Sequence, residues 1–187
     1  MLNLNFPSFP NLTTSRLTLR QLKADDANEI FLIRSDASVN QYLDRPKANS
    51  IEDARIFIEK IRVGMLKKDS LYWAITLKND SKLIGTVTLW NISVEEMKGE
   101  IGYELLPAFQ GKGIMQEAIA EVLAFGFEKI GLKKIEAFTH ARNEKSVRLL
   151  MRNNFSRDAE LENELKQTDE FGEMVTYSLV ETNWRRS

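Results

Sequence analysis

The spacing of apolar residues changes several times along the chain, and each change predicts a new element. Residues 15–22 alternate leucines with polar side chains, which is the pattern of a half-buried strand. Residues 51–65 place apolar side chains at helical spacing, behind Ser50 and Asp53, a pair typical of a helix start. In chain order the pattern predicts a strand at 15–22, helices after Asp26 and at 51–65, strands at 71–77, 82–91 and 100–106, a helix at 113–129, a strand at 134–139, a helix at 143–153 and a strand at 174–180.

This order of elements predicts a mixed α/β fold in which helices cover both faces of one sheet. A length of 187 residues suits a single domain over residues 1–187. The Pro- and Asn-rich start indicates that residues 1–13 form a loose arm, and the highly charged segment 160–173 suggests a turn-rich hairpin. Gly131 and Asn154 stand where two of the helices should end, because both residue types tolerate the left-handed backbone.

The stretch Leu105–Ala118, LLPAFQGKGIMQEA, joins a strand end to the most apolar predicted helix through a loop with two glycines. Gly111 and Gly113 let the backbone approach a ligand closely, and the first N–H groups of a helix have no partner inside it. Such helix starts bind phosphate groups, and Lys112 adds a positive charge. The stretch predicts an anion cradle, although the same pattern fits an ordinary turn before a helix. It has neither the GxxxxGK[ST] spacing of a P-loop nor the GxGxxG of a dinucleotide fold.

Composition narrows the classes of protein that fit. A hydrophobic content of 43% and a net charge of −1 are ordinary for a globular protein, and they give no overall field that would attract nucleic acid or an acidic membrane. The chain has no cysteine and one histidine, so disulfides, thiolate zinc sites and histidine-based metal clusters are excluded and no metal is expected. No apolar run reaches the ~18 residues of a membrane helix. The first residues lack the features of a secretory signal, so we expect a cytoplasmic protein.

Several short segments follow one another in a recognisable order. They are Thr14–Arg20 (TSRLTLR), Glu100–Leu105 (EIGYEL), Gln110–Met115 (QGKGIM), Asn143–Ser146 (NEKS), Phe155 and Tyr177–Trp184 (YSLVETNW). Together they resemble the GNAT acetyltransferases, and within them the RimJ/RimL-like subfamily that includes ribosomal-protein N-terminal acetyltransferases. The glycine loop is similar to the Q/R-x-x-G-x-G/A signature of that family. The resemblance spans residues 14–184 and implies the GNAT fold, a single mixed and mostly antiparallel sheet with helices on both faces.

The resemblance implies transfer of an acetyl group from acetyl-CoA to a primary amine by direct attack on the thioester, with CoA as product. The amine would belong either to a small molecule or to a protein N-terminus. The alternative is a non-catalytic module that binds acetyl-CoA as a sensor or scaffold. No membrane or nucleic-acid partner is expected, and a homodimer is left open.

The resemblance also assigns roles to individual residues. The backbone N–H of Leu105, or one close to it, would stabilise the developing oxyanion. Asn143 would hydrogen-bond the pantetheine, and Ser146 would protonate the departing thiolate or serve only as a helix residue. The residues that would hold the pyrophosphate are Gln110, Gly111, Lys112, Gly113, Ile114 and Met115.

The identity of a general base is left open between two carboxylates. Glu100 and Glu104 share one face of a strand, because side chains alternate with a period of two. Either could remove the proton of the amine, directly or through water, and Glu100 is preferred because it matches the family segment. The competing interpretation for each glutamate is a salt bridge or a contact with solvent. An amine that is already neutral would need neither glutamate as a base.

Other residues have a functional and a structural interpretation side by side. Met115 replaces the usual small residue of the signature, and its side chain either enters the core or crowds the pyrophosphate. His140 is either a base or a strand-end residue that bonds the local backbone. The aromatic residues that would line an acceptor pocket or the core are Tyr42, Trp73 and Trp90, and the cations that would meet a CoA phosphate or solvent are Lys133, Lys134 and Arg152.

Overall fold

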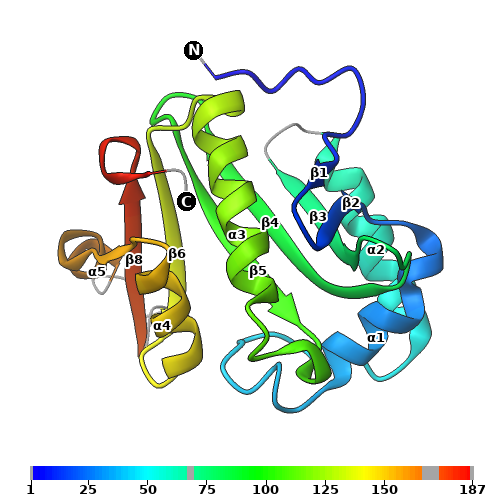
Figure 1. Ribbon diagram of the computed structural model, residues 1–187. Coiled ribbons are helices and arrows are strands. Elements are labelled where there is room, and N and C mark those ends of the chain that lie inside the picture. The colour runs from blue at the N-terminus through cyan, green and yellow to red at the C-terminus, as the bar shows by residue number, and fades with distance from the viewer. Residues whose placement is uncertain (1, 67–69, 166–172, 186–187) are drawn as a thin grey trace.

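A single sheet organises the chain (Figure 1). The computed structural model describes residues 2–66, 70–165 and 173–185. The strands are β1 Leu12–Thr13, β2 Leu17–Gln21, β3 Leu71–Leu77, β4 Leu83–Ser93, β5 Lys98–Leu105, β6 Lys134–His140, β7 Ser156–Arg157 and β8 Met174–Val180. The α-helices are α1 Ala27–Ser35, α2 Ile51–Met65, α3 Ile114–Ala124, α4 Glu144–Arg152 and α5 Ala159–Leu165. These elements include every strand and helix that the sequence pattern predicts, in the predicted order.

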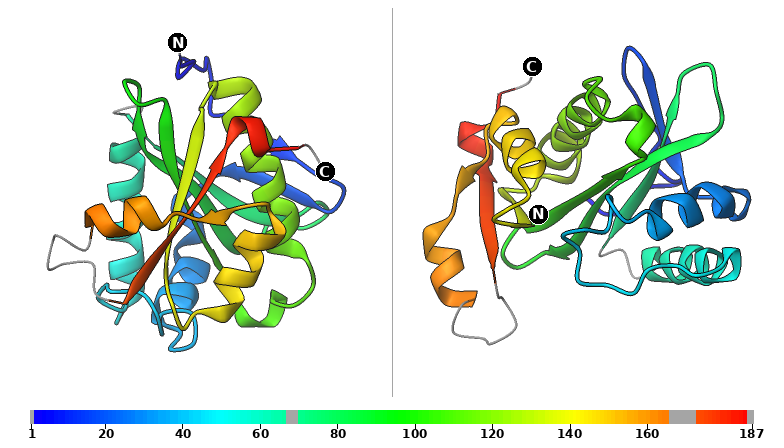
Figure 2. Two further views of the ribbon diagram at one scale, coloured as in Figure 1. Left: turned by 90° about the vertical axis from the view of Figure 1, so that its left-hand side faces the viewer. Right: turned by 90° about the horizontal axis from the view of Figure 1, so that it is seen from below.

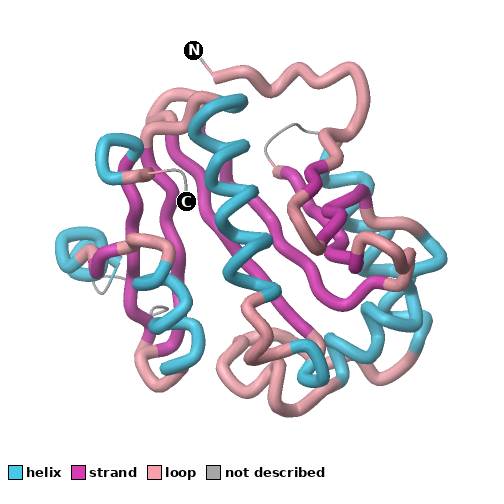
Figure 3. Tube along the Cα trace, viewed as in Figure 1, coloured by secondary structure: helices cyan, strands magenta, loops and turns pink. Residues whose placement is uncertain are grey.

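The strands lie side by side in the order β1-β2-β3-β4-β5-β6-β8-β7 (Figure 3). Among the described residues every neighbouring pair is antiparallel except β5 with β6, which run parallel. The expected mixed, mostly antiparallel sheet is therefore confirmed. The parallel pair lies in the middle of the sheet, where the glycine loop and α3 connect its two strands.

Helices cover both faces of the sheet (Figure 2). Leu105 and Ile101 on β5 belong to the larger core, which also holds the buried face of α3 and Leu150 of α4. The smaller core lies on the opposite face, where α1 and α2 pack over Ala74 and Leu83. Because alternate residues of a strand point to opposite faces, the two carboxylates of β5 point toward the side of α1 and α2.

The predicted helix ends are confirmed by backbone conformation. Asn154 after α4 has φ 63°, and Gly131 after the long central helix has φ 87°. That helix runs as α3 and then continues as a π-helix over Phe125–Ile130. Gly126 permits the wider turn to pack tightly, since a Cβ there would lie 3.1 Å from Ile135 Cδ1. Ser50 caps α2 as predicted, accepting a hydrogen bond from the backbone N–H of Asp53.

Two expectations about irregular segments need correction. Residues 2–11 carry no helix or strand, but they are not loose, because Phe6 stacks on Phe125 and Trp73 Nε1 donates to Pro10 O at 2.7 Å. Leu12 and Thr13 form β1. The charged segment 160–173 begins as the helix α5 rather than as a hairpin, and residues 166–172 lie outside the described part of the chain. Sequence spacing missed both features because single apolar residues in a polar segment show no period.

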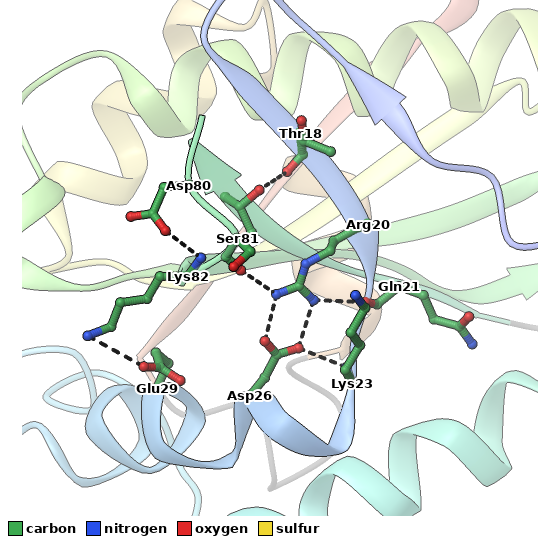
Figure 4. A network of polar contacts seen from close by, with 10 residues as sticks. Thr18, Arg20, Gln21, Lys23, Asp26, Glu29, Asp80, Ser81 and Lys82 are labelled. Atoms are coloured by element: carbon green, nitrogen blue, oxygen red, sulfur yellow. Dashed lines mark hydrogen bonds and ion pairs between the residues drawn. The ribbon is translucent and has the colours of Figure 1, made fainter. Parts of the chain in front are cut away.

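A partly buried ion pair joins the start of the sheet to α1 (Figure 4). The Arg20 guanidinium donates to both carboxylate oxygens of Asp26, at 2.8 and 2.6 Å, and also to the carbonyl of Ser81 at 2.8 Å. Asp26 further accepts the backbone N–H of Lys23 at 2.8 Å. One bidentate pair therefore fixes β2, the first helix and the β3–β4 turn relative to one another.

Candidate active site

The sheet opens into a wedge between β5 and β6. The described pairing of these strands covers Lys98–Glu100 against Lys134–Glu136 and goes no further. Beyond it β6 continues beside β8, while β5 continues beside β4 as far as Leu105 opposite Gly85 (Figure 3). The last five residues of β5, 101–105, therefore present one edge that has no strand beside it in the described chain.

Backbone groups of β5 point into this wedge. Leu106 N–H donates to Ile84 O on β4 at 3.0 Å. Because the direction of the N–H alternates along a strand, the N–H groups of Tyr103 and Leu105 point the other way, toward the open edge. The carbonyl of Leu105 on that edge accepts a hydrogen bond from Gln110 Nε2 at 3.0 Å, which ties the strand end to the glycine loop.

The glycine loop lies between the open edge and the start of α3. Gly111 and Gly113 have φ of 74° and 72°, in the left-handed region that favours glycine. Gly113 is also the residue before the first turn of α3, and no side chain caps that helix start. Lys112 bends back, and its Nζ donates to Ala108 O at 2.8 Å. The side chain of Met115 is buried in the core, so it does not crowd the loop.

A tyrosine and a serine meet across the wedge. Ser146 Oγ in the first turn of α4 lies 2.9 Å from Tyr103 Oη on β5. Burial raises the pKa of Tyr103 to about 12, against a smaller lowering effect of the Ser146 hydrogen bond, so the phenol stays neutral near pH 7. Asn143 caps α4, accepting the Ser146 N–H at 3.2 Å, and Lys145 Nζ reaches Gln110 Oε1 at 3.3 Å. The start of α4 is thereby held against both the strand and the glycine loop.

A half-buried carboxylate supports the loop from the side of β2. Glu117, in the first turn of α3, accepts hydrogen bonds from the hydroxyls of Thr14 and Ser15 and from Arg16 N–H at 2.9 Å and Nε at 2.6 Å. Arg16 Nη1 donates in addition to Lys112 O at 3.0 Å. Burial would raise the pKa of Glu117, but these hydrogen bonds outweigh it and hold the pKa at about 2. Arg16 thus fixes the loop and neutralises a charge beside it.

The two candidate bases lie on the other face, at different distances from the loop. Glu104 is next to Leu105 and forms an ion pair with Arg45 from the loop between α1 and α2. Glu100 lies five residues from Leu105, roughly 17 Å along a strand, at the closed end of the wedge. Burial and the nearby charge of Glu136 raise the pKa of Glu100, while a hydrogen bond from Asn91 at 2.8 Å lowers it.

The remaining candidates divide between core, surface and the wedge. Trp73 is fully buried in the core, whereas Trp90 is 45% exposed. Tyr42 stacks on His140 with ring centroids 5.3 Å apart, so the loop between α1 and α2 contacts the end of β6. Lys134 is engaged by Glu136 and Asp158 at 3.0 and 2.9 Å, away from the glycine loop. Lys133 pairs with Glu181, and Arg152 is exposed.

Sequence reasoning missed four residues of this site: Arg16, Arg45, Tyr103 and Lys145. For Tyr103 a signal was present, because its period-two spacing from Leu105 places it on the strand face opposite the glutamates. Arg16 belongs to the segment Thr14–Arg20 that carries the family resemblance, but the sequence shows no partner that would suggest its role.

In residues 2–66, 70–165 and 173–185 no helix is long and apolar enough to cross a membrane, and no group of three or more acidic or histidine side chains could hold a metal ion.

Comparison with known proteins gives consistent matches over most of the chain. Residues 16–156 match the family model described as Acetyltransferase (GNAT) domain. The Bacillus subtilis (strain 168) protein Uncharacterized N-acetyltransferase YoaA is 33% identical over 172 residues, covering 92% of this chain and 97% of that protein.

Solved structures share the fold. The Microcin C7 self immunity acetyltransferase MccE, in complex with acetyl-CoA and AMP, has a TM-score of 0.73 and 25% identity, over 89% of this chain and 93% of that one. The ribosomal-protein-S5-alanine acetyltransferase from Vibrio fischeri has a TM-score of 0.73 and 22% identity, over 94% and 99%.

Proposed function

The chain belongs to the GNAT family of acetyltransferases, and from this premise we propose that it moves the acetyl group of acetyl-CoA to a primary amine by direct attack on the thioester. The match over residues 16–156 and the 33% identical N-acetyltransferase confirm the family and the class of enzyme that the motifs predicted. The observation that carries the proposal is the open edge of β5 beside the glycine loop. It provides backbone donors for a thioester carbonyl next to a cradle for phosphates.

The glycine loop fits the diphosphate of a CoA molecule. Gly111 and Gly113 leave the backbone uncovered, and the first N–H groups of α3 extend the cradle with the positive end of the helix dipole. A Cβ at Gly111 would meet nothing within 4 Å, so the space beside the loop is open. Acetyl-CoA supplies the activated acetyl group when bound. The MccE acetyltransferase, which shares this fold, has been solved in complex with that molecule.

Each residue at the wedge has a role that its placement supports. The Leu105 N–H on the open edge would donate to the carbonyl oxygen as negative charge develops there. Asn143 uses its carbonyl oxygen as the cap of α4, which leaves its amide N–H groups for the pantetheine. Ser146 would give its proton to the departing thiolate, and the Tyr103 phenol would hold the Ser146 hydroxyl in place.

Glu104 is better placed than Glu100 to receive the proton of the amine. It is adjacent to Leu105, while Glu100 is roughly 17 Å away along the strand. The Glu104 carboxylate is shared with Arg45, so we expect it to act through a water molecule rather than by direct contact. An amine that enters the site already neutral would need no side-chain base.

The cofactor assignment is tested by acetyl-CoA binding to two Gly→Asp variants. Gly113→Asp would force a side chain into a left-handed position and place a negative charge in the cradle. Gly64→Asp on α2 is the control, because a side chain there would meet nothing within 4 Å. We expect calorimetry to show wild-type affinity for Gly64→Asp and no measurable binding for Gly113→Asp. Undiminished affinity of Gly113→Asp would contradict the assignment.

The transfer itself is tested by release of the CoA thiol from acetyl-CoA. Short peptides with free N-termini and small primary amines are offered as two parallel sets of acceptors. Acceptor-dependent release in either set supports the proposed reaction. Bound acetyl-CoA without release in either set would contradict it.

A further inference from the structure

The face of β5 that carries Glu104 is bordered by a preorganised arginine. Arg45 forms the ion pair with Glu104 and donates from Nε and Nη2 to Asn40 Oδ1, at 2.9 and 2.8 Å. Asn40 is only 5% exposed, and its Nδ2 bonds the carbonyls of Ile33 and Asp36 at 3.0 and 2.8 Å. Because this buried amide orients Arg45, the charge of Glu104 is already balanced within the protein.

A second arginine beside this pair has no carboxylate of its own in the described part of the chain. The guanidinium of Arg34 on α1 lies 3.9 Å above the ring of Phe57, which itself contacts Tyr72 edge-on at 5.9 Å. Tyr72 lies opposite Thr88 on β4, on the same face and two residues along from Thr86, which lies opposite Glu104. Burial, and then the charge of Arg45, lower the pKa of Arg34, while the charge of Glu104 raises it. Among the described residues the Arg34 guanidinium has neither a hydrogen bond nor a carboxylate partner. Two cations thus share one anion, and the half-buried cluster carries an excess positive charge.

We propose that the acceptor is a primary amine that carries a carboxylate close to it, and that Arg34 binds this carboxylate. The inference rests on the proposed function, and it names the class of acceptor for the same site. Arginine binds carboxylates through charge-assisted hydrogen bonds, and a partly buried arginine does so with less competition from water. The same excess charge repels polycations such as a diamine.

The test compares acceptors in which a carboxylate is replaced by a neutral amide or by a second amine. 4-Aminobutyrate, its neutral amide 4-aminobutanamide and the diamine putrescine form one set. Tripeptides with free N-termini and either aspartate or asparagine at the second position form the other, so that a free amino acid and a peptide are distinguished. Each is assayed with the wild type, Arg34→Gln and the control Arg55→Gln, whose side chain is exposed on α2 and paired with Glu52.

We expect the wild type to use the carboxylate member of at least one set with a kcat/KM at least 10-fold above its neutral partner. Arg34→Gln should reduce that ratio to about 1 by raising the KM for the carboxylate acceptor. Arg55→Gln should leave the ratio unchanged. A wild type that prefers the neutral amine or the diamine overturns the inference. A ratio that Arg34→Gln does not change overturns it as well.

Two measurements distinguish a failure of the Arg34 inference from a failure of the proposed acetyl transfer. Calorimetry with acetyl-CoA tests the cofactor assignment alone. Binding of 4-aminobutyrate and 4-aminobutanamide to the protein, followed by ligand NMR line broadening, tests the Arg34 site without turnover. Stronger binding of the carboxylate that disappears in Arg34→Gln supports the inference even if no acetyl transfer occurs. Equal binding of the two compounds overturns it even if acetyl transfer proceeds.

Discussion

The hydrogen bond between Ser146 and Tyr103 determines what a single hydroxyl can do at the wedge. Ser146 Oγ has one proton, and Tyr103 Oη at 2.9 Å either donates to it or accepts from it. Because burial keeps the phenol protonated, Tyr103 can donate to Ser146 and leave the serine proton free for a leaving group. In the proposed reaction the pair would therefore combine a proton donor, Ser146, with the residue that orients it, Tyr103.

Substitutions at these two residues separate chemistry from binding. Ser146→Ala should lower kcat by roughly 100-fold, the size of one general-acid contribution, while the affinity for acetyl-CoA changes little. Tyr103→Phe keeps the ring and loses only the hydroxyl, so we expect a smaller loss, on the order of 10-fold. Steady-state kinetics and calorimetry measure the two quantities, with the exposed Ser156→Ala as control. Equal losses of kcat and affinity would instead make Ser146 a binding residue.

At the scale of elements, Arg16 links the β1–β2 strands to the loop and helix that would hold a diphosphate. Without Arg16 the carboxylate of Glu117 would stand unneutralised in the first turn of α3, close to the bound phosphates. Arg16→Gln should therefore weaken acetyl-CoA binding about 10-fold, a typical size for one close charge. The double variant Arg16→Gln with Glu117→Gln should recover most of that loss, because the repelling carboxylate is also removed.

Calorimetry decides between this electrostatic role and a direct contact. Arg62→Gln, which removes an exposed arginine paired with Glu59 on α2, is the control and should bind like the wild type. If the double variant binds as weakly as Arg16→Gln, the arginine contacts the phosphates itself and the neutralising role is wrong.

The same carboxylate makes the β2–α3 contact sensitive to acid. The pKa of Glu117 is depressed to about 2 from its ordinary value of 4.5, so its ionised form stabilises the fold above pH 4.5 and this contribution is lost as the pH falls through 2. Glu117→Gln should lower the free energy of unfolding at pH 7 by about 2 kcal/mol, because solvent screening reduces the full effect of the shift. Urea unfolding at a series of pH values should show the difference from the wild type shrinking below pH 4.5. A difference that stays constant with pH would contradict the role of the charge.

The sequence predicted those parts of the site that follow from local spacing. The glycine loop, the cap at Ser50 and the shared face of Glu100 and Glu104 all lie within short stretches of the chain. By contrast, the contacts Tyr103–Ser146 and Arg16–Glu117 join residues 43 and 101 positions apart. No periodicity pairs such residues, because their meeting depends on how the sheet splays and on which helix fills the gap.

At the scale of the whole molecule, the sheet divides the site into two sides. The glycine loop, α3 and Ser146 lie on one face, and Glu104, Arg45 and Arg34 lie on the face of α1 and α2. The wedge between β5 and β6 is the place where the two sides meet. We therefore expect donor and acceptor to approach from opposite faces, so that a change in the acceptor residues alters specificity without altering affinity for acetyl-CoA.

The N-terminal segment closes the far end of the larger core, and its contribution to stability can be measured. Phe9 contacts Trp73 edge-on at 5.8 Å, and Asn3 N–H bonds Ile130 O at 2.8 Å. Phe9→Ala should lower the free energy of unfolding by roughly 2 kcal/mol, less than the ~3–5 of a fully buried phenylalanine because this side chain is only partly buried. Ser8→Ala, an exposed neighbour, should have no effect.

Urea unfolding followed by tryptophan fluorescence measures both variants, and the native emission spectrum, to which Trp73, Trp90 and Trp184 contribute, gives a second signal. Loss of Phe9 should expose one edge of the fully buried indole and shift its emission to the red before global unfolding. If Phe9→Ala leaves both the unfolding midpoint and the emission unchanged, the segment lies against the core without stabilising it. In that case the candidate active site, at the other end of α3, would not depend on residues 2–11.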